Sequence, residues 1–169
     1  DYNIFGCNGI LFNHERPRRG ETFVTKKIIS ALCKIKEGKQ NKLFLGNLDS
    51  KRDWGHAKDY CLAMWKILQQ KKPDDYVIAT GIQYSIRQFI NLTAKKLKMK
   101  ISWKGKGLNE KGYNEKGISI IECDKAYLRP LDVNTLIGDA KKAKKKLKWK
   151  PVEDINSLID EMIRYEYQQ

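Results

Sequence analysis

Short apolar runs alternate along this chain with longer segments in which apolar residues recur every three or four positions. This alternation constrains the fold more than any other feature of the sequence. A short apolar run bounded by turn residues is typical of a strand, whereas the longer period is that of an amphipathic helix. Strands are predicted at residues 9–14, 42–45, 76–79, 101–103 and 118–123, with a strand-like segment at 133–137. Such alternation favours the α/β class, with the strands at 9–14 and 76–79 buried.

Five helices are predicted, because apolar side chains repeatedly share one helical face. Gly38 stands where a left-handed residue ends the first helix, Ser85 with Gln88 has the capping-box pattern that opens the third, and Asp139 can cap the fourth. The segment 105–117 is rich in Gly, Lys and Asn and is expected to be an exposed, mobile loop. The residues of the five faces, in chain order, are Val24, Ile28, Ala31, Leu32 and Ile35; Ala57, Tyr60, Cys61, Met64 and Leu68; Ile86, Phe89, Ile90, Thr93 and Leu97; Ala140, Ala143 and Leu147; and Ile155, Leu158, Ile159, Met162 and Ile163.

The formal net charge of +14 raises nucleic acid or an anionic surface as a partner. However, 27 of the 34 basic residues are Lys and only 7 are Arg, whereas recognition of bases and phosphates by a planar fork uses Arg. The most basic stretch, residues 141–150, is predicted to be a packed helix with a solvated lysine side, to which no chemistry is assigned. Nucleic acid is therefore not the predicted partner.

Four cysteines, at positions 7, 33, 61 and 123, are irregularly spaced, and the chain has only two histidines. This spacing argues against a zinc site, so no metal is predicted, and all four thiols are expected to be reduced packing residues. The first residues include no initiator Met and no leader, so the chain is expected to begin within a longer, cytoplasmic protein. No apolar run approaches the roughly 20 residues of a membrane-spanning helix, so no membrane partner is predicted.

A cluster of donors follows the first predicted strand, in the segment NHERPRRGETF at residues 13–23. Open α/β sheets bind ligands beyond the carboxyl ends of their strands. Arg16, Arg18 and Arg19 would repel one another unless an anion or acidic partner offsets their charge, which favours a phosphate-bearing ligand. The alternative is a solvated loop whose arginines are paired with carboxylates.

Two further segments carry an arginine in a distinctive setting. In GNLDSKRDWGHAKD, residues 46–59, Arg52 is followed by the carboxylate of Asp53 and the aromatic Trp54, a combination able to bind a phosphate or a base. The alternative is a surface contact between Arg52 and Asp53, with Trp54 packed under the loop. Arg129 precedes a proline in YLRP, residues 127–130, which could aim it at a ligand.

Four stretches of the chain together resemble the GDP-mannose 4,6-dehydratases, a group within the extended short-chain dehydrogenase/reductase family. They are NGILFNHE-x-PRRGETFVT-x-KI (8–28), GNLD-x-KRDWGHAKDY with AMW (46–65), DYVIATG (75–81) and GDAKKAKKKLKWKP (138–151). The resemblance implies the end of a Rossmann-type NAD(P)-binding domain, intermixed with a smaller α/β domain that binds the sugar nucleotide. Residues 1–169 would be the carboxyl-terminal part of the enzyme, without its NADP-fingerprint and catalytic region.

The family reaction, as the resemblance implies it, converts GDP-mannose to GDP-4-keto-6-deoxymannose with NADP, on the route to GDP-fucose. The chain has no Tyr-x-x-x-Lys pair and no Gly-rich dinucleotide turn, so no catalytic residue is assigned and the fragment alone is expected to be inactive. By similarity, His14 and Arg19 match positions that contact NADP. Asn13, Lys27, Arg52 and Arg129 match positions around the GDP of the substrate.

The resemblance also implies a homo-oligomer, a dimer or tetramer, in which the PRRG loop at residues 17–20 crosses the subunit interface. Two other functions stay open from the sequence. One is a non-catalytic nucleotide-binding or assembly module, and the other is a basic nucleic-acid-binding domain.

Overall fold

The computed structural model describes residues 4–128, 131 and 133–168, and the chain in it divides into two compact units. Each unit is assembled from three separate segments of the chain. Unit 1 comprises Asp1–Arg16, Arg52–Gln83 and Leu136–Leu158, and unit 2 comprises Pro17–Lys51, Tyr84–Thr135 and Ile159–Gln169. Arg129, Pro130 and Asp132 lie outside the described residues, so the predicted site residue Arg129 is not placed.

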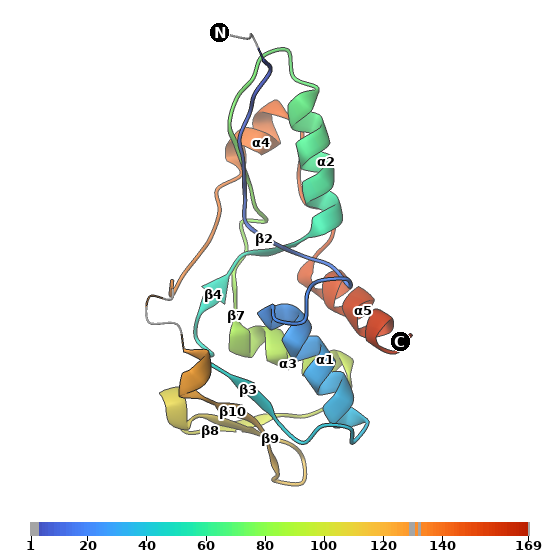
Figure 1. The fold of residues 1–169 in the computed structure, drawn as a ribbon, viewed down its shortest axis with the longest axis vertical. Coiled ribbons are helices and arrows are strands. Elements are labelled where there is room, and N and C mark those ends of the chain that lie inside the picture. Colours follow the sequence, from blue (N-terminus) through green and yellow to red (C-terminus); the bar gives the residue numbers. More distant parts are fainter. Residues whose placement is uncertain (1–3, 129–130, 132, 169) are drawn as a thin grey trace. The chain divides into compact units, whose positions relative to one another are not determined.

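Unit 1 contains two pairs of parallel strands with helices packed beside them (Figure 1). β1 (Gly9–Leu11) pairs with β6 (Tyr76–Ile78), and β2 (Asn13–Glu15) pairs with β5 (Trp54–His56). The helices are α2 (Ala57–Leu68) and α4 (Lys141–Lys146). Their buried side chains form one hydrophobic core with β6, made of Tyr60, Ala63, Ile67, Tyr76, Ile78, Ala143, Leu147 and Trp149.

The strand predicted at residues 9–14 is broken into β1 and β2 at Phe12, and the expectation that it is buried is wrong, since none of these six residues is buried. Gly9 is exposed and Ile10 is 55% exposed, because within the described residues β1 pairs on one side only, with β6. Phe12 continues the attachment by donating its N–H to the carbonyl of Ile78, at 3.0 Å. The strand predicted at 76–79 is buried as expected, with Tyr76 at 2%, Ile78 at 0% and Ala79 at 1% exposure.

The predicted helix α2 forms, but its buried face is not the predicted one. Tyr60, Ala63 and Ile67 are buried, whereas Met64 and Leu68 are exposed. Cys61 is exposed too, so its assignment as a packing residue is wrong. Ala63 and Ile67 stand three and seven residues after Tyr60, so the face that packs is turned relative to the one predicted.

Unit 2 is built around a four-stranded mixed sheet with the strand order β3-β10-β9-β8 (Figure 1). β3 (Leu43–Leu45) runs parallel to β10 (Ser119–Cys123), which pairs antiparallel with β9 (Lys111–Tyr113). β9 pairs in turn with β8 (Ser102–Lys104). The helices are α1 (Val24–Lys36) and α3 (Ile86–Lys96), whose core side chains Ile28, Ile29, Leu32, Phe89 and Ile90 are each 0% exposed.

The segment 105–117 is exposed at residues 105–109 and 115–117, as predicted, but it is not a loop throughout. It contains a short 3-10 helix, η1 (Gly107–Asn109), and the strand β9. Gly112 in β9 is buried, and a Cβ there would lie 3.1–3.2 Å from side chains of Ile101, Trp103 and Ile121. A glycine at this position lets β9 fit between its neighbours. In the sequence Gly112 suggests a loop, but the close packing of the sheet is what requires a glycine here.

The predicted helix ends are largely confirmed. Gly38 adopts a positive φ of 73° just beyond α1, and Ser85 with Gln88 forms both hydrogen bonds of a capping box at α3. Asp139 accepts a hydrogen bond from the amide of Lys141 at 3.0 Å, although α4 itself has only six residues. The last helix, α5 (Ile155–Glu166), buries all five predicted apolar residues. The segment 133–137 forms no strand and contributes only a bridge between Lys51 and Thr135.

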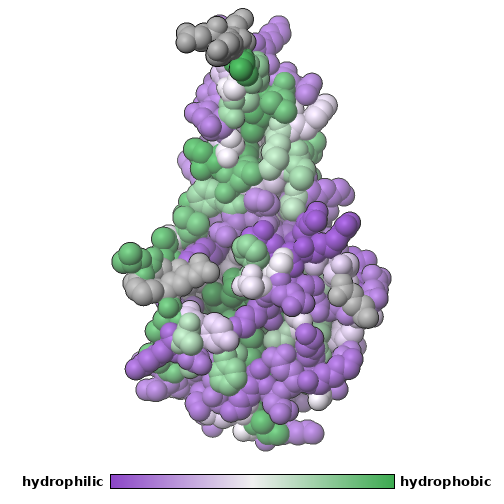
Figure 2. Space-filling view, in the orientation of Figure 1, coloured by the Kyte–Doolittle hydropathy of each residue, from purple (hydrophilic) through white to green (hydrophobic). Residues whose placement is uncertain are grey.

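Two short elements complete the chain. β4 (Lys51–Arg52) pairs with β7 (Tyr84–Ser85), and a 3-10 turn, η2 (Lys125–Tyr127), follows β10. All four cysteines are free thiols, with Cys33 buried and Cys7 and Cys123 half-buried. Hydrophilic side chains cover most of the visible face of unit 2 (Figure 2). In the part of the chain that is described, no helix is both long and apolar enough to cross a membrane.

Candidate nucleotide-binding site

Two of the three polar segments singled out in the sequence lie side by side in unit 1. The parallel register of β2 and β5 places Asn13 opposite Trp54 and His14 opposite Gly55. Arg52 stands two residues before Trp54, at the end of β4. Asn13, His14 and Arg52 are all half-buried, so each is partly accessible to a ligand. The structure therefore brings the NHE and RDWGH segments together.

His14 is held in a defined orientation. Its Nδ1 lies 2.9 Å from the carbonyl oxygen of Phe12, and since a carbonyl only accepts, Nδ1 carries a proton. The imidazole also stacks on the ring of Tyr60, with 5.0 Å between ring centroids and 29° between ring planes. Nε2 is therefore the ring nitrogen left to contact a ligand.

Tyr60, the other ring of this stack, is itself held in place by buried neighbours. It is 0% exposed and makes an edge contact with Trp149, with 6.2 Å between centroids. Gly55 permits the arrangement, because a Cβ there would lie 2.4 Å from a ring carbon of Tyr60. The Tyr60 hydroxyl is buried with no hydrogen-bond partner among the described residues. Burial, followed by the carboxylates of Asp53, Asp59 and Glu15, raises the pKa of this hydroxyl above its ordinary range.

Asp53 has a structural role that the sequence did not predict. Its carboxylate is 0% exposed and accepts hydrogen bonds from the amides of Thr80 and Gly81, each at 2.9 Å, and of Gly138 at 3.2 Å. The Thr80 hydroxyl donates a fourth bond, at 2.5 Å. Asp53 therefore ties the end of β6 to the segment before α4. Trp54, at 2% exposure, is packed beneath the surface, as the second interpretation of this segment had it.

The predicted site residues Arg19 and Lys27 lie in unit 2, Arg19 in the loop before α1 and Lys27 in its first turn. The Arg19 guanidinium carbon lies 3.4 Å from the centroid of the Phe23 ring, and the Lys27 ammonium lies 3.4 Å from that of Tyr127. Such cation–π contacts orient a positive charge. The contact with Tyr127 also fixes η2 against α1, two residues before Arg129 in the sequence.

Gly46 lets η2 approach the end of β3 closely. A Cβ at Gly46 would lie 2.3 Å from the carbonyl oxygen of Tyr127. Three segments of unit 2 therefore meet: the start of α1, the residue after β3, and η2. The sequence had associated Gly46 only with the loop that leads to Arg52.

Arg87 has a structural role, because its guanidinium is paired with two carboxylates of the chain. Its guanidinium binds Glu110 and Asp49, at 2.5 Å for each of the closest contacts. The Glu110 carboxylate, more than Asp49, raises the pKa of Arg87 above its ordinary value. Within the described residues, no group of three or more His, Cys, Asp or Glu side chains is arranged to hold a metal ion.

Comparison with known proteins identifies close relatives. The family model described as GDP-mannose 4,6 dehydratase matches residues 1–162. The chain is 50% identical to GDP-mannose 4,6 dehydratase 2 of Caenorhabditis elegans over 162 residues, 50% identical to the human GDP-mannose 4,6 dehydratase over 163, and 47% identical to that of Vibrio cholerae serotype O1 over 179. These matches cover 96%, 96% and 99% of this chain but 42%, 44% and 48% of the relatives. The chain thus spans about half the length of the relatives it matches.

Solved structures with the same fold are more distant in sequence. RMD from Pseudomonas aeruginosa, complexed with NADPH, has a TM-score of 0.76 at 20% identity, covering 95% of this chain and 47% of that one. UDP-glucuronic acid 4-epimerase from Bacillus cereus has a TM-score of 0.75 at 17% identity, covering 99% of this chain and 47% of that one. The predicted α/β fold of the extended short-chain dehydrogenase/reductase type is confirmed.

Proposed function

Because this chain belongs to the GDP-mannose 4,6-dehydratase family, we propose that the protein containing it converts GDP-mannose to GDP-4-keto-6-deoxymannose. The observation that carries the proposal is the 47–50% identity to three enzymes of that name over nearly the whole chain. This product is a precursor of GDP-fucose and other deoxysugars. The chain spans about half of those relatives and lacks the Tyr-x-x-x-Lys pair, so we expect it to be inactive alone.

In this proposal the chain binds the GDP moiety of the substrate. Asn13 and Arg52 contribute from the adjoining ends of β2 and β4, and Lys27 contributes from α1. Arg129, two residues after Tyr127, completes the set. An amide and three cations match the acceptors and the negative charge of a nucleoside diphosphate.

The proposed cofactor is a nicotinamide dinucleotide, and specifically NADP, which supplies the acceptor and donor of hydride. The chain's own residues fit this partner. The orientation of His14 leaves Nε2 to meet a cofactor oxygen, and Arg19 offers a planar cation for its phosphate. The other half of the cofactor site would come from the region with the Gly-rich turn.

The division into two units fits the roles of the family's two domains. We assign unit 1, with its parallel strand pairs, to the remainder of the Rossmann domain, and unit 2 to the substrate domain. The loop at 17–20, in which Arg18 is exposed, is the proposed contact between subunits of a homo-oligomer. Four free thiols agree with a cytoplasmic location.

The test is the reaction itself, in the full-length protein that contains this chain. Incubation with NADP and ¹³C-labelled GDP-mannose should yield a 4-keto-6-deoxy sugar nucleotide, visible as a new methyl signal from C6 in the NMR spectrum. The 169-residue chain alone should give none. Nucleotide binding by the full-length protein without any methyl signal would favour the non-catalytic module.

A further inference from the structure

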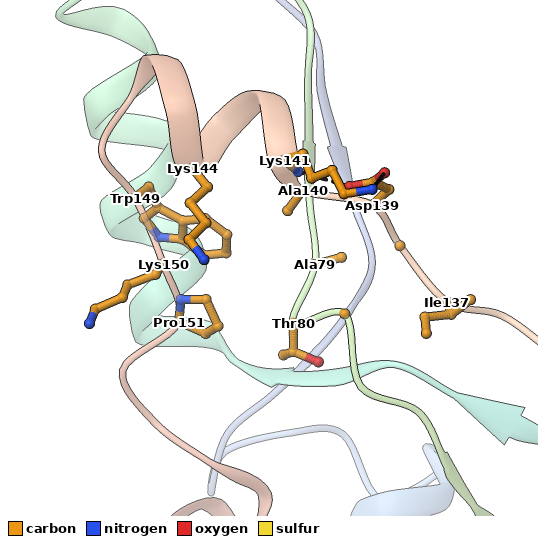
Figure 3. Close-up of a pocket in the computed structure, with 12 residues that line it drawn as sticks. Ala79, Thr80, Ile137, Asp139, Ala140, Lys141, Lys144, Trp149, Lys150 and Pro151 are labelled. Atoms are coloured by element: carbon orange, nitrogen blue, oxygen red, sulfur yellow. Dashed lines mark hydrogen bonds and ion pairs between the residues drawn. The ribbon is translucent and has the colours of Figure 1, made fainter.

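A pocket of about 560 Å³ lies within unit 1, beyond the carboxyl end of β6 (Figure 3). Its size falls in the range of small-molecule sites, and its place at a strand end is where open α/β sheets bind ligands. None of the described residues assigned to GDP or NADP lines it. The lining residues come from the turn after β6, the segment before α4, α4 itself and the segment after it: Ala79–Gly81, Ile137–Lys141, Lys144 and Trp149–Pro151.

Two backbone walls of the pocket are held rigidly by one buried group. The Asp53 carboxylate binds the amides of Thr80 and Gly81 on one wall and that of Gly138 on the other. The walls also touch, since a Cβ on Gly138 would lie 2.2 Å from that of Ala79. A cavity whose walls are fixed in this way is preformed, so a ligand need not order it on binding.

The lysine run around α4 leaves an excess of positive charge at this pocket. Lys142 and Lys146 are both paired with Asp74, and Lys141 with Asp139. Lys144 and Lys150 also line the pocket, and their side chains have no ion pair or hydrogen bond within the described residues. Three ammonium groups therefore meet one carboxylate, that of Asp139.

Lys144 is the lysine best directed at a ligand. Figure 3 shows its side chain running from α4 past Trp149 toward the open space opposite Thr80, whereas that of Lys150 extends outward. The alkyl side chains of Ile137 and Ala140 and the ring of Pro151 supply apolar lining elsewhere in the pocket. The pocket thus combines one inward cation, two flanking cations and carbon surface.

We propose that this pocket binds a small organic phosphate, at a site separate from the nucleotide-sugar and cofactor residues. Ammonium groups on flexible stems bind a phosphate as point charges, without the fixed geometry of an arginine fork. The apolar lining accepts the carbon part of the same molecule. Lys144 is the principal phosphate ligand, and the ion pair of Lys141 with Asp139 forms the rim.

The test uses phenyl phosphate as the probe and the 169-residue chain, with phenol and inorganic phosphate as matched partial ligands. Amide NMR signals of Gly81, Gly138 and Lys144 should shift on titration with phenyl phosphate, and it should bind more tightly than either partial ligand. Lys144→Gln should weaken binding about tenfold, the scale of one charge-assisted hydrogen bond. The control Lys145→Gln removes the same charge from the neighbouring exposed residue, outside the pocket lining, and should change the affinity less than about twofold.

Two results would overturn the proposal. One is the absence of shifts at these three amides when phenyl phosphate is present. The other is an equal loss of affinity in the Lys144 and Lys145 variants, since this would mean diffuse attraction to a basic surface. Thermal unfolding of both variants, with Tm values expected close to that of the parent because both side chains are exposed, establishes that the comparison is between folded proteins.

Discussion

The imidazole of His14 lies stacked on the ring of Tyr60, with 5.0 Å between the ring centroids, while its Nδ1 donates to the carbonyl of Phe12. Neither residue could be paired with the other from the sequence, since 46 positions separate them. The parallel pairing of β2 with β5 makes the contact, because α2 begins directly after β5. The orientation of a proposed cofactor ligand therefore depends on a buried aromatic residue.

Replacement of Tyr60 should separate the role of its ring from that of its hydroxyl. Tyr60→Phe keeps the stack and removes a buried hydroxyl without a partner among the described residues, so unfolding free energy should stay within about 1 kcal/mol of the parent or rise. Tyr60→Leu should abolish the upfield ring-current shift of the His14 ring protons, measured by NMR. Retention of that shift in Tyr60→Leu would show that the stack does not orient His14.

The same hydroxyl predicts a pH dependence at the alkaline end. Its pKa is raised in the folded chain, so it stays protonated there after an unfolded tyrosine, with a pKa of about 10, has ionised. Below about pH 10 the hydroxyl is protonated in both states and causes no pH dependence, whereas the folded state loses stability as pH rises from there through the folded pKa. Denaturant unfolding at pH 9 and pH 11 should show a smaller alkaline loss in Tyr60→Phe than in the parent. An equal loss in the two proteins would assign the effect to other groups.

Gly55→Ala should disturb the stack from the opposite side. The added Cβ would lie 2.4 Å from a Tyr60 ring carbon, so the ring or the strand must move, at a cost of about 1–3 kcal/mol of unfolding free energy. Gly6→Ala is the matched control, because no atom lies within 4 Å of its Cβ position. Similar stability of the two variants in urea would show that the close approach at Gly55 does not constrain Tyr60.

Asp53→Ala should be among the most destabilising single substitutions in unit 1. It removes a buried carboxylate that accepts from the amides of Thr80, Gly81 and Gly138, of which that of Gly138 is buried, and we expect a loss of about 3–5 kcal/mol. Asp139→Ala is the control, since that exposed carboxylate caps one amide of a short helix and should cost about 1 kcal/mol or less. Comparable losses in urea-induced unfolding would rule out the proposed difference between them.

Arg52→Ala should weaken binding of GDP by about 1.5–3 kcal/mol, the scale of charge-assisted hydrogen bonds. The same loss is expected for Arg129→Ala, at a position outside the described residues. Arg164→Ala, on the exposed side of α5, should leave the affinity unchanged. Isothermal titration of GDP into the full-length protein gives the three values, and unchanged affinity in both of the first two variants would remove these arginines from the site.

Local patterns predicted the elements whose signals are contained within a few residues. The capping box of Ser85 and Gln88, the left-handed Gly38 and the apolar face of α5 were all recognisable in the sequence and all form. Where a residue's role depends on partners far away in the sequence, the local pattern gave a wrong prediction. Gly112 resembled a loop residue because its reason for being glycine is the close packing of Ile101, Trp103 and Ile121.

The candidate site was predictable only as separate segments. Donor-rich loops after strands pointed to a phosphate ligand, and the family resemblance assigned roles to Asn13, His14 and Arg52. The register that places these segments together, and the buried functions of Asp53 and Tyr60, follow from strand pairing between residues about 40 positions apart. A carboxylate beside an arginine has the same local sequence whether it binds the arginine or, as Asp53 does, three backbone amides.

The central claim is that the protein recognises a guanosine diphosphate sugar, and thermal unfolding of the full-length protein with different sugar nucleotides tests it most directly. At a concentration of about 100 times its dissociation constant, a specific ligand stabilises the folded state by about 2.7 kcal/mol. We predict a clear rise in Tm with GDP-mannose and little change with UDP-glucose or dTDP-glucose at equal concentration. Equal stabilisation by all three, or none by GDP-mannose, would contradict the assignment.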